Sequence, residues 1–238
     1  MIANRRNFRR LYLAEGLERE ERLDEILELA ATHALDVTRV ARSRLDDMVA
    51  ANHHGVLLEA SPYPYVEEYD LDELAQDKGI ILALDSIVDP QNVGTLLRTA
   101  EATGVKLVVI PSDRAATITP AVVNVSSGAV EHLQIAEETN LTRFLNRAKE
   151  AGFWVAGLAG DEGAEPLFDS RMTPPLVLVV GSEGSGLRRL VRETCDLVVS
   201  IPMAGRVESL NAAVAGSIAL YEILRDAEDL GESDDMPD

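Results

Sequence analysis

Three short segments in the second half of the chain combine glycines with polar side chains suited to chemistry. A guanidinium can bind an oxyanion, a carboxylate can accept hydrogen bonds from hydroxyls or amines, and amides and hydroxyls can orient both. The candidates, in chain order, are Asn92, Arg98, Glu183, Ser209 and Asn211. The same residue types also serve as helix caps, turn residues and solvated side chains, so each must be weighed against that ordinary role.

The segment 89–98 reads Asp-Pro-Gln-Asn-Val-Gly-Thr-Leu-Leu-Arg. Pro90 fixes a turn, and Asn92 suits a helix N-cap because its side chain can accept an orphan N–H. Gly94 permits close backbone approach, and Arg98 interrupts an otherwise apolar helix face. Capping and a solvated arginine would explain the segment equally well if it stood alone.

The other two segments follow apolar runs. Three glycines in six residues, in Gly-Ser-Glu-Gly-Ser-Gly from residue 181, expose backbone amides and leave room for a ligand beside Glu183. The segment 201–211 reads Ile-Pro-Met-Ala-Gly-Arg-Val-Glu-Ser-Leu-Asn, and Ser209 can cap the small-residue helix behind it. Tight packing explains the small residues but not the polar pair Ser209 and Asn211.

Several common signatures are missing from the sequence. It contains no G-x-G-x-x-G after the first strand of either block, no Gly-Lys pair of a P-loop, and no G-x-S-x-G elbow. The four histidines show no metal-ligand spacing, so we expect no metal site.

The elements that position these segments follow from alternating apolar strands and helices. Strands are expected over 80–86, 106–110, 131–136, 153–159, 176–180 and 197–201, and helices over 92–103, 140–151, 186–194 and 209–226. Continuous apolar strands separated by helices predict a parallel sheet covered on both faces, an α/β fold. Ligands of such sheets bind beyond the carboxyl ends of the strands, where the three segments lie.

A shorter α/β block precedes this sheet. Strands are expected over 8–13, 36–40 and 56–60 and helices over 20–31 and 43–50. The predicted domains are therefore 1–66 and 80–225, joined by a linker over 67–79. The last residues, 226–238, hold seven acids and no base, which predicts a disordered acidic tail.

Charge at first argues against a nucleic-acid partner. The 238 residues carry 22 Lys and Arg against 41 Asp and Glu, which gives a net charge of −19. Without the seven acids of the tail, the net charge would be −12. Nineteen of the bases are arginines, the better phosphate ligands, and four crowd the N-terminus: Arg5, Arg6, Arg9 and Arg10. We expect these to be the RNA-binding patch if the partner is RNA.

Compartment follows from simpler features. The single cysteine, Cys195, cannot form an internal disulfide, and the chain shows neither an apolar run long enough to cross a bilayer nor a secretory signal. A reducing, cytoplasmic location without membrane association is the expectation.

The three segments, in order and spacing, resemble the SpoU (TrmH) class of RNA 2′-O-ribose methyltransferases of the SPOUT superfamily. The matches are N-x-G-x-x-x-R at 92–98, G-x-E-G-x-G at 181–186 and I-P-M-x-G-x-x-x-S-L-N at 201–211. The subclass with an N-terminal L30e-like RNA-binding domain fits best, with 52–56 resembling the turn that ends that domain. Two departures are a first domain that looks N-terminally shortened and Ala213 at a position where the family usually has serine.

The resemblance implies a trefoil-knotted methyltransferase domain, a homodimer and the cofactor S-adenosylmethionine. Residues at the matching positions for the cofactor are Gly181, Ile201, Met203, Gly205 and Leu210. It further implies methyl transfer to a ribose 2′-hydroxyl, with 23S rRNA as substrate. Arg98 would activate or stabilise the attacking oxygen, Asn92 and Glu183 would orient it or the arginine, and Ser209 and Asn211 would complete a polar floor.

The sequence leaves three other interpretations open. The acceptor is tRNA rather than rRNA, or the chain is a non-catalytic RNA-binding assembly factor of the same fold. The third, an α/β enzyme without a nucleic-acid substrate, is suggested by net charge alone.

Overall fold

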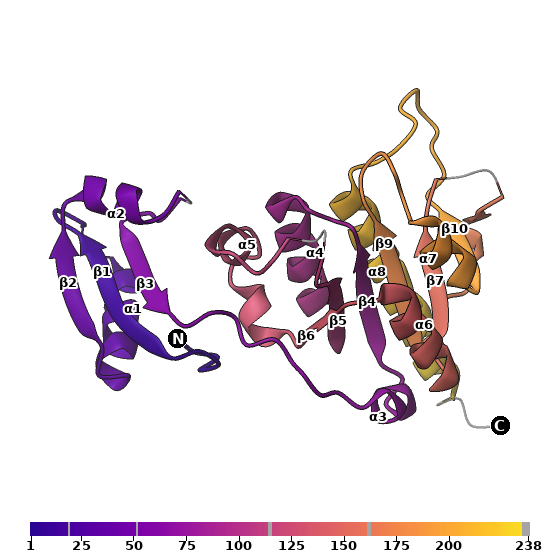
Figure 1. The fold of residues 1–238 in the computed structure, drawn as a ribbon, viewed down its shortest axis with the longest axis horizontal. Coiled ribbons are helices and arrows are strands. Elements are labelled where there is room, and N and C mark those ends of the chain that lie inside the picture. Colours follow the sequence, from indigo (N-terminus) through magenta and orange to yellow (C-terminus); the bar gives the residue numbers. More distant parts are fainter. Residues whose placement is uncertain (19, 51, 114–115, 161–162, 235–238) are drawn as a thin grey trace. The chain divides into compact units, whose positions relative to one another are not determined.

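The computed structural model describes residues 1–238 except 19, 51, 114–115, 161–162 and 235–238. The chain divides into two compact units, Met1–Pro64 and Tyr65–Asp238. Each unit has its own sheet, and Figure 1 shows their elements coloured along the sequence. In the part of the chain that the structure describes, no helix combines the length and apolar character that crossing a bilayer requires.

The first unit is a small three-stranded sheet with two helices. In chain order its elements are β1 (Phe8–Ala14), α1 (Glu21–Thr32), β2 (Asp36–Val40), α2 (Arg42–Met48) and β3 (Val56–Ala60). The central strand β1 pairs in parallel with β2 and antiparallel with β3. Its inward residues Leu11 and Leu13 pack with Leu23 and Ala30 of α1, which forms a separate small core.

The second unit contains a seven-stranded sheet in the order β6-β5-β4-β9-β7-β10-β8, and every neighbouring pair is parallel. Its strands are β4 (Ile80–Asp85), β5 (Leu107–Pro111), β6 (Ile135–Glu138), β7 (Trp154–Leu158), β8 (Glu165–Pro166), β9 (Leu176–Gly181) and β10 (Leu197–Ser200). The predicted covered parallel sheet is therefore confirmed.

Helices cover both faces of this sheet (Figure 1). The α-helices are α3 (Leu71–Gln76), α4 (Pro90–Ala102), α5 (Pro120–Val125), α6 (Leu141–Glu150), α7 (Arg189–Thr194) and α8 (Ala212–Asp234). Residues of α6 and α7 pack with Ile81 and Ala83 of β4, whereas α4 and α8 pack together, with α8 also against β9. All residues of β4 and β9 are buried, as expected of strands covered on both sides.

Both predicted N-caps are wrong. Asp89 caps α4 by accepting the N–H of Gln91 at 3.1 Å, so Asn92 lies inside the first turn. Asn211 caps α8, since its Oδ1 accepts the N–H groups of Ala213 and Val214 at 2.9 and 3.1 Å. In both helices a residue near the predicted one supplies the cap. Asn92 therefore does not cap a helix, whereas Asn211 is both a helix cap and a candidate site residue.

Other differences concern short or terminal elements. The strand expected over 131–136 is a 3₁₀ turn at Ala129–His132 followed by β6, and α5 was not predicted. The helix expected from Gly186 starts at Arg189: Gly186 has a positive φ of 62°, and Arg188, before the helix, is extended. A disordered tail was expected from Asp226, but helix α8 continues to Asp234. The carboxylate of Asp226 accepts a hydrogen bond from the N–H of Met172 at 3.1 Å. The end of the predicted tail, 235–238, lies outside the described residues.

Candidate functional site

A cluster of three polar side chains joins the three segments at the carboxyl end of the sheet. The amide nitrogen Nδ2 of Asn211 donates to Oδ1 of Asn92 at 2.7 Å and also to Oε1 of Glu183. The same Glu183 oxygen accepts the backbone N–H of Ala212 at 3.3 Å. Residues 119 positions apart thus meet in one hydrogen-bonded group, as the spacing of the segments after their strands requires.

Secondary structure fixes each member of this cluster. Asn92 is 6% exposed and is the third residue of α4, in the turn that Asp89 caps. Asn211 is held through its cap of α8, so its carbonyl end serves the helix and its amide end serves the cluster. Glu183 follows β9 and is exposed, which leaves its second oxygen available to a ligand.

Glycine at 181 is required by the loop that carries Glu183. A Cβ there would overlap the backbone carbon and oxygen of Gly186, because the loop folds back through a bridge between Ser182 and Gly186. The hydroxyls of Ser182 and Ser185 also bond at 2.6 Å. The fold of this loop therefore requires glycine at position 181, whether or not this residue also contacts a cofactor.

Close helix packing accounts for two further glycines. A Cβ on Gly94 would lie 2.6 Å from Cβ of Val125, so this glycine lets α4 approach α5. A Cβ on Gly216 would lie 2.5 Å from Leu96, and the hydroxyls of Thr99 and Ser217 bond at 2.8 Å between α4 and α8. The predicted tight packing of the small-residue helix is confirmed.

Arg98 and Ser209 do not join the hydrogen-bonded cluster. Both are exposed, and the structure gives neither side chain a hydrogen bond or ion pair with the described residues. Arg98 follows Asn92 by six residues on α4. An exposed guanidinium without a protein partner keeps all five N–H donors for a ligand.

The segment between β10 and α8 holds most of the predicted cofactor residues. Ile201, Met203 and Leu210 are half-buried and Gly205 is exposed. Within the described part of the chain, the N–H groups of 203–210 make no backbone hydrogen bond. Half-buried apolar side chains beside unbonded amides fit a ligand with an aromatic base and polar groups, such as S-adenosylmethionine.

One ion pair beside this edge was not anticipated. Asp85 ends β4, is wholly buried, and accepts from both the backbone N–H and Nε of Arg188, at 2.7 and 2.5 Å. Its strand register places it opposite Gly181. In the sequence, the only indication of this pair is a lone acid at the end of an apolar strand. The pairing shows that Asp85 anchors the chain between β9 and α7.

The four N-terminal arginines are distributed over several partners. The guanidinium groups of Arg5 and Arg6 lie 5.4 and 5.2 Å from the ring centre of Tyr63, a cation–π arrangement. Arg9 pairs with Glu59 at 3.7 Å and Arg10 with Asp36 at 3.9 Å. All belong to the first unit, but sequence proximity does not make them one patch.

Thiol and metal chemistry find little support in the described residues. Cys195 is half-buried and donates to the carbonyl of Val191 at 3.3 Å, and burial raises its pKa to about 11, which keeps it a thiol at neutral pH. No group of three His, Cys, Asp or Glu side chains among them is arranged to hold a metal ion.

Comparisons with known proteins agree with this geometry. Residues 79–221 match the SpoU rRNA Methylase family, and residues 1–66 match the RNA 2′-O ribose methyltransferase substrate binding family. A 23S rRNA (guanosine-2′-O-)-methyltransferase, RlmB, of Pseudomonas putida is 41% identical over 91% of this chain and 88% of its own. A putative TrmH family tRNA/rRNA methyltransferase, YacO, of Bacillus subtilis is 41% identical over 95% of this chain and 92% of its own.

Solved structures give the same result. The SpoU methyltransferase AviRb from Streptomyces viridochromogenes, in complex with AdoMet, is similar with a TM-score of 0.74 and 26% identity, covering 97% of this chain and 86% of that one. A structure titled RNA 2′-O ribose methyltransferase has a TM-score of 0.78 and 26% identity, covering 94% and 83%. The chain belongs to the SpoU rRNA methylase family.

Proposed function

We propose that this protein transfers a methyl group from S-adenosylmethionine to a ribose 2′-hydroxyl of structured RNA, with 23S rRNA as the substrate. The observation that carries the proposal is the hydrogen-bonded meeting of Asn92, Glu183 and Asn211 at the carboxyl end of the sheet. The name of the Pseudomonas relative supports the choice of rRNA.

Arg98 is the residue proposed to act on the reacting oxygen. A 2′-hydroxyl is a weak acid, and its oxygen becomes a nucleophile as its proton passes to solvent water. A guanidinium scarcely deprotonates in proteins, so Arg98 stabilises the developing alkoxide and holds the adjacent phosphate through its planar donors. Its side chain is exposed and has no hydrogen bond or ion pair with the described residues, which suits that role.

The polar cluster is proposed to position the substrate and the loops around it. The free carboxylate oxygen of Glu183 accepts a hydrogen bond from the ribose or from Arg98, while Asn211 holds Glu183 in place. Asn92 stabilises that arrangement from α4, and Ser209 adds a hydroxyl at the exposed side. These groups orient the acceptor so that the reaction becomes effectively unimolecular.

The cofactor would be held by Gly181, Ile201, Met203, Gly205 and Leu210. Backbone amides of residues 203–210 would bind the polar groups of the cofactor. The half-buried side chains of Ile201, Met203 and Leu210 would pack on its adenine. When bound, the cofactor supplies an electrophilic methyl group on a sulfonium, a chemistry that needs no phosphate cradle and agrees with the missing P-loop.

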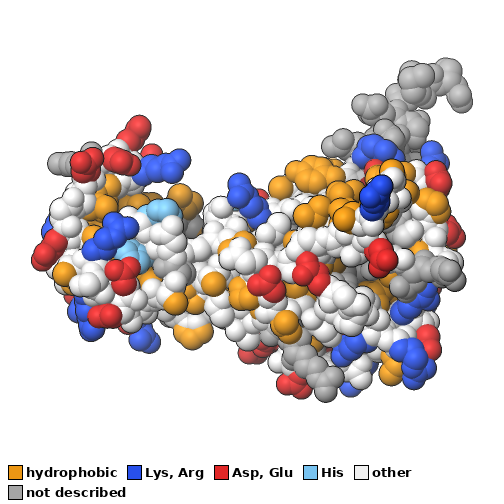
Figure 2. Space-filling model, turned by 90° about the horizontal axis from the view of Figure 1, so that it is seen from above, with side chains coloured by type: hydrophobic (Ala, Val, Ile, Leu, Met, Phe, Trp, Pro, Cys, Tyr) orange, Lys and Arg blue, Asp and Glu red, His pale blue; other side chains and the backbone are white. Residues whose placement is uncertain are grey.

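The proposal includes a trefoil knot and a cytoplasmic homodimer. It also assigns RNA binding to domain 1–66 and methyl transfer to domain 80–225. Exposed apolar residues of α8 and of the loop before it, Val207, Val214 and Tyr221, are suited to a partner surface. Figure 2 shows hydrophobic side chains gathered on one face of the second unit. The first domain would bind RNA, with Arg5, Arg6, Arg9 and Arg10 as contacts.

Methylation of tRNA is the second candidate, because the Bacillus relative's name includes both RNA classes. The test is to incubate the protein with S-adenosylmethionine carrying a labelled methyl group and with separated 23S rRNA, 16S rRNA and tRNA, and then map the labelled nucleotide. Label on a ribose of 23S rRNA is expected. Label on tRNA alone would replace the substrate, and label in no RNA would contradict the enzymatic proposal.

A further inference from the structure

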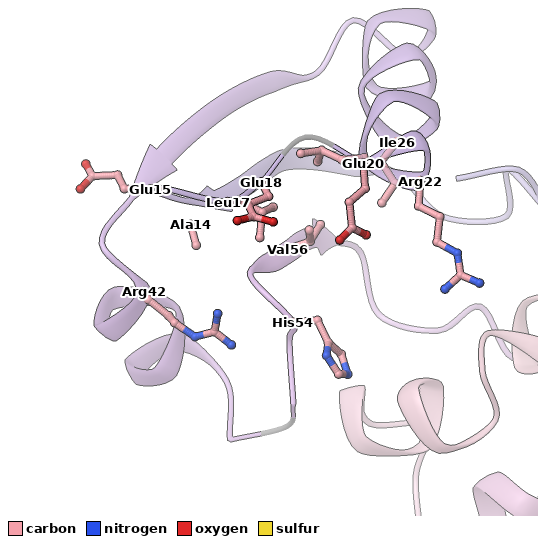
Figure 3. A pocket seen from close by; sticks show the side chains of 12 residues that line it. Ala14, Glu15, Leu17, Glu18, Glu20, Arg22, Ile26, Arg42, His54 and Val56 are labelled. Carbon is pink, nitrogen blue, oxygen red and sulfur yellow. The ribbon is translucent and has the colours of Figure 1, made fainter.

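The first unit contains a cavity that the proposed reaction does not use. Its volume is about 450 Å³, within the range of small-molecule sites. It lies between the end of β1, the beginnings of α1 and α2, and the turn that leads into β3 (Figure 3). The hydrogen-bonded cluster of Asn92, Glu183 and Asn211 belongs to the other unit.

Apolar side chains form part of the lining of this cavity. Leu17, Ile26 and Val56 line it, and all three are half-buried and pack against the core of the first unit. A planar, weakly hydrated ring can rest on such a surface, whereas a flexible polar chain gains little from it.

The turn before β3 is built to present His54 at the rim. His53 bonds through Nε2 to Asp46 at 3.0 Å and accepts the N–H of Gly55 through Nδ1 at 2.9 Å. His54 itself has a positive φ of 48°, which is unusual for a residue with a side chain. Figure 3 shows the imidazole of His54 pointing away from the side chain of Val56.

The rim carries charges of both signs that do not satisfy one another. Arg22, Arg42, Glu18 and Glu20 line the cavity, and none of their side chains makes a hydrogen bond or ion pair in the described part of the chain. Figure 3 shows the Arg42 guanidinium and the Glu18 and Glu20 carboxylates turned toward the space between β1, α1 and α2. Elsewhere in this unit Arg9 and Arg10 do pair with acids.

We propose that this cavity binds one unpaired guanine nucleotide of the RNA substrate, which anchors the RNA on the first unit. The base lies on the apolar part of the lining, and a Glu18 or Glu20 carboxylate accepts from its N1–H and N2 amine. Arg42 and Arg22 bind the flanking phosphates. Among the bases, guanine presents two adjacent donors on its Watson–Crick edge that match a carboxylate, and sequence-specific RNA readers favour such splayed bases.

The inference rests on the proposed function, because it assumes an RNA substrate. The test uses the full chain and a fluorescent RNA hairpin whose loop has one guanosine, compared with hairpins carrying inosine or adenosine there. Inosine keeps N1–H and loses only the N2 amine. We expect the unaltered protein to bind the guanosine hairpin about tenfold more tightly than either substitute.

Variants assign that preference to the cavity. The double variant Glu18→Gln, Glu20→Gln should bind all three hairpins equally, whereas the matched pair Glu21→Gln, Glu25→Gln, also exposed on or beside α1, should keep the tenfold preference. Arg42→Ala should weaken binding of every hairpin about tenfold, and Arg44→Ala on the same helix less than twofold. Equal effects of test and control variants would overturn the proposal.

Two further measurements separate this idea from the enzymatic one. A hairpin with 6-thioguanosine, photocrosslinked to the unaltered protein, should attach within 14–26 or 42–56, and attachment elsewhere would refute the site. Methyl transfer to 23S rRNA is measured on the same preparation. Transfer without a guanosine preference removes the cavity proposal alone, and a preference without transfer removes the proposed reaction alone.

Discussion

The polar cluster of the second unit and the arginines of the first unit assemble in opposite ways. Asn92 and Asn211 are 119 residues apart and share a hydrogen bond of 2.7 Å. Arg5, Arg9 and Arg10 lie within six residues of one another, and their side chains contact Tyr63, Glu59 and Asp36 respectively. Residues far apart in the sequence converge in the second unit, whereas in the first unit Arg5 and Arg6 share Tyr63 but Arg9 and Arg10 each pair with a different acid.

The difference follows from the elements that carry them. Strands β4, β9 and β10 are parallel members of one sheet, so their carboxyl ends lie along one edge and whatever follows each strand meets there. Arg9 and Arg10 are neighbours on strand β1, where successive side chains point to opposite faces, and Arg5 lies before that strand. In the view of Figure 2, Lys and Arg side chains lie on both units. Position after a strand is therefore the better indicator of a site than charge density along the sequence.

The largest effect is expected at Arg98. Replacing it with alanine removes the proposed stabiliser of the alkoxide and should lower the rate of methyl transfer by about 10²–10³-fold. Arg98→Lys keeps the charge but loses the planar fork, and should recover little of the rate. Single-turnover transfer of labelled methyl groups measures both. Arg143→Ala, an exposed arginine on α6, serves as the control, and near-normal turnover of Arg98→Lys would refute the bidentate role.

A smaller effect, on stability, is expected at Gly181. Its Cβ would overlap the backbone of Gly186, so Gly181→Ala should lower the free energy of unfolding by about 2–3 kcal/mol and displace the loop that carries Glu183. Chemical denaturation measures the change. Gly160→Ala, where a Cβ meets no atom within 4 Å, should alter stability by less than about 0.5 kcal/mol. Equal stability of the two variants would show that the loop does not fold back as described.

The smallest effects are expected at the N-terminal arginines. Arg9→Ala and Arg10→Ala should each weaken RNA binding by about twofold to threefold, because both side chains are exposed and share their charge with an acid. Each should also reduce the salt dependence of binding, by about one released counterion for every phosphate that the arginine neutralises. Fluorescence anisotropy across a salt series measures both, with Arg171→Ala as an exposed control in the second unit. A hundredfold weaker affinity at either position would restore the idea of one concentrated patch.

Much of the fold was predictable because its strands are long, apolar and buried. Residues 80–84 and 176–180 read as covered parallel strands, and the glycines at 104 and 152 have the positive φ expected after a helix. Helix α5 was missed because it is short and rich in valine, a residue that favours strands. The extension of α8 beyond Asp226 was missed because composition could not reveal that this acid is buried beside Met172.

The site was predictable in its membership but not in its connections. The sequence identifies Asn92, Glu183 and Asn211 as candidates, but it predicts Ser209 as the cap of the last helix and does not reveal Asn211 as the hub. The pair between Asp85 and Arg188 depends on a contact across 103 positions, which a single sequence does not show. Which side chain bonds to which is set by loop conformations, and these depend on packing rather than on local pattern.

The central claim is that Asn211 and Glu183 act as one unit in methyl transfer. A double-mutant cycle on single-turnover rates tests it with Asn211→Ala, Glu183→Gln and the combination. If the two residues work through their shared hydrogen bond, the double variant should be about as slow as the slower single variant. The exposed Asn146→Ala, combined with Glu183→Gln, is the control for independent behaviour. In the control, the fold-reductions of the two single variants should multiply in the double variant. The same multiplication for Asn211→Ala with Glu183→Gln would contradict the account.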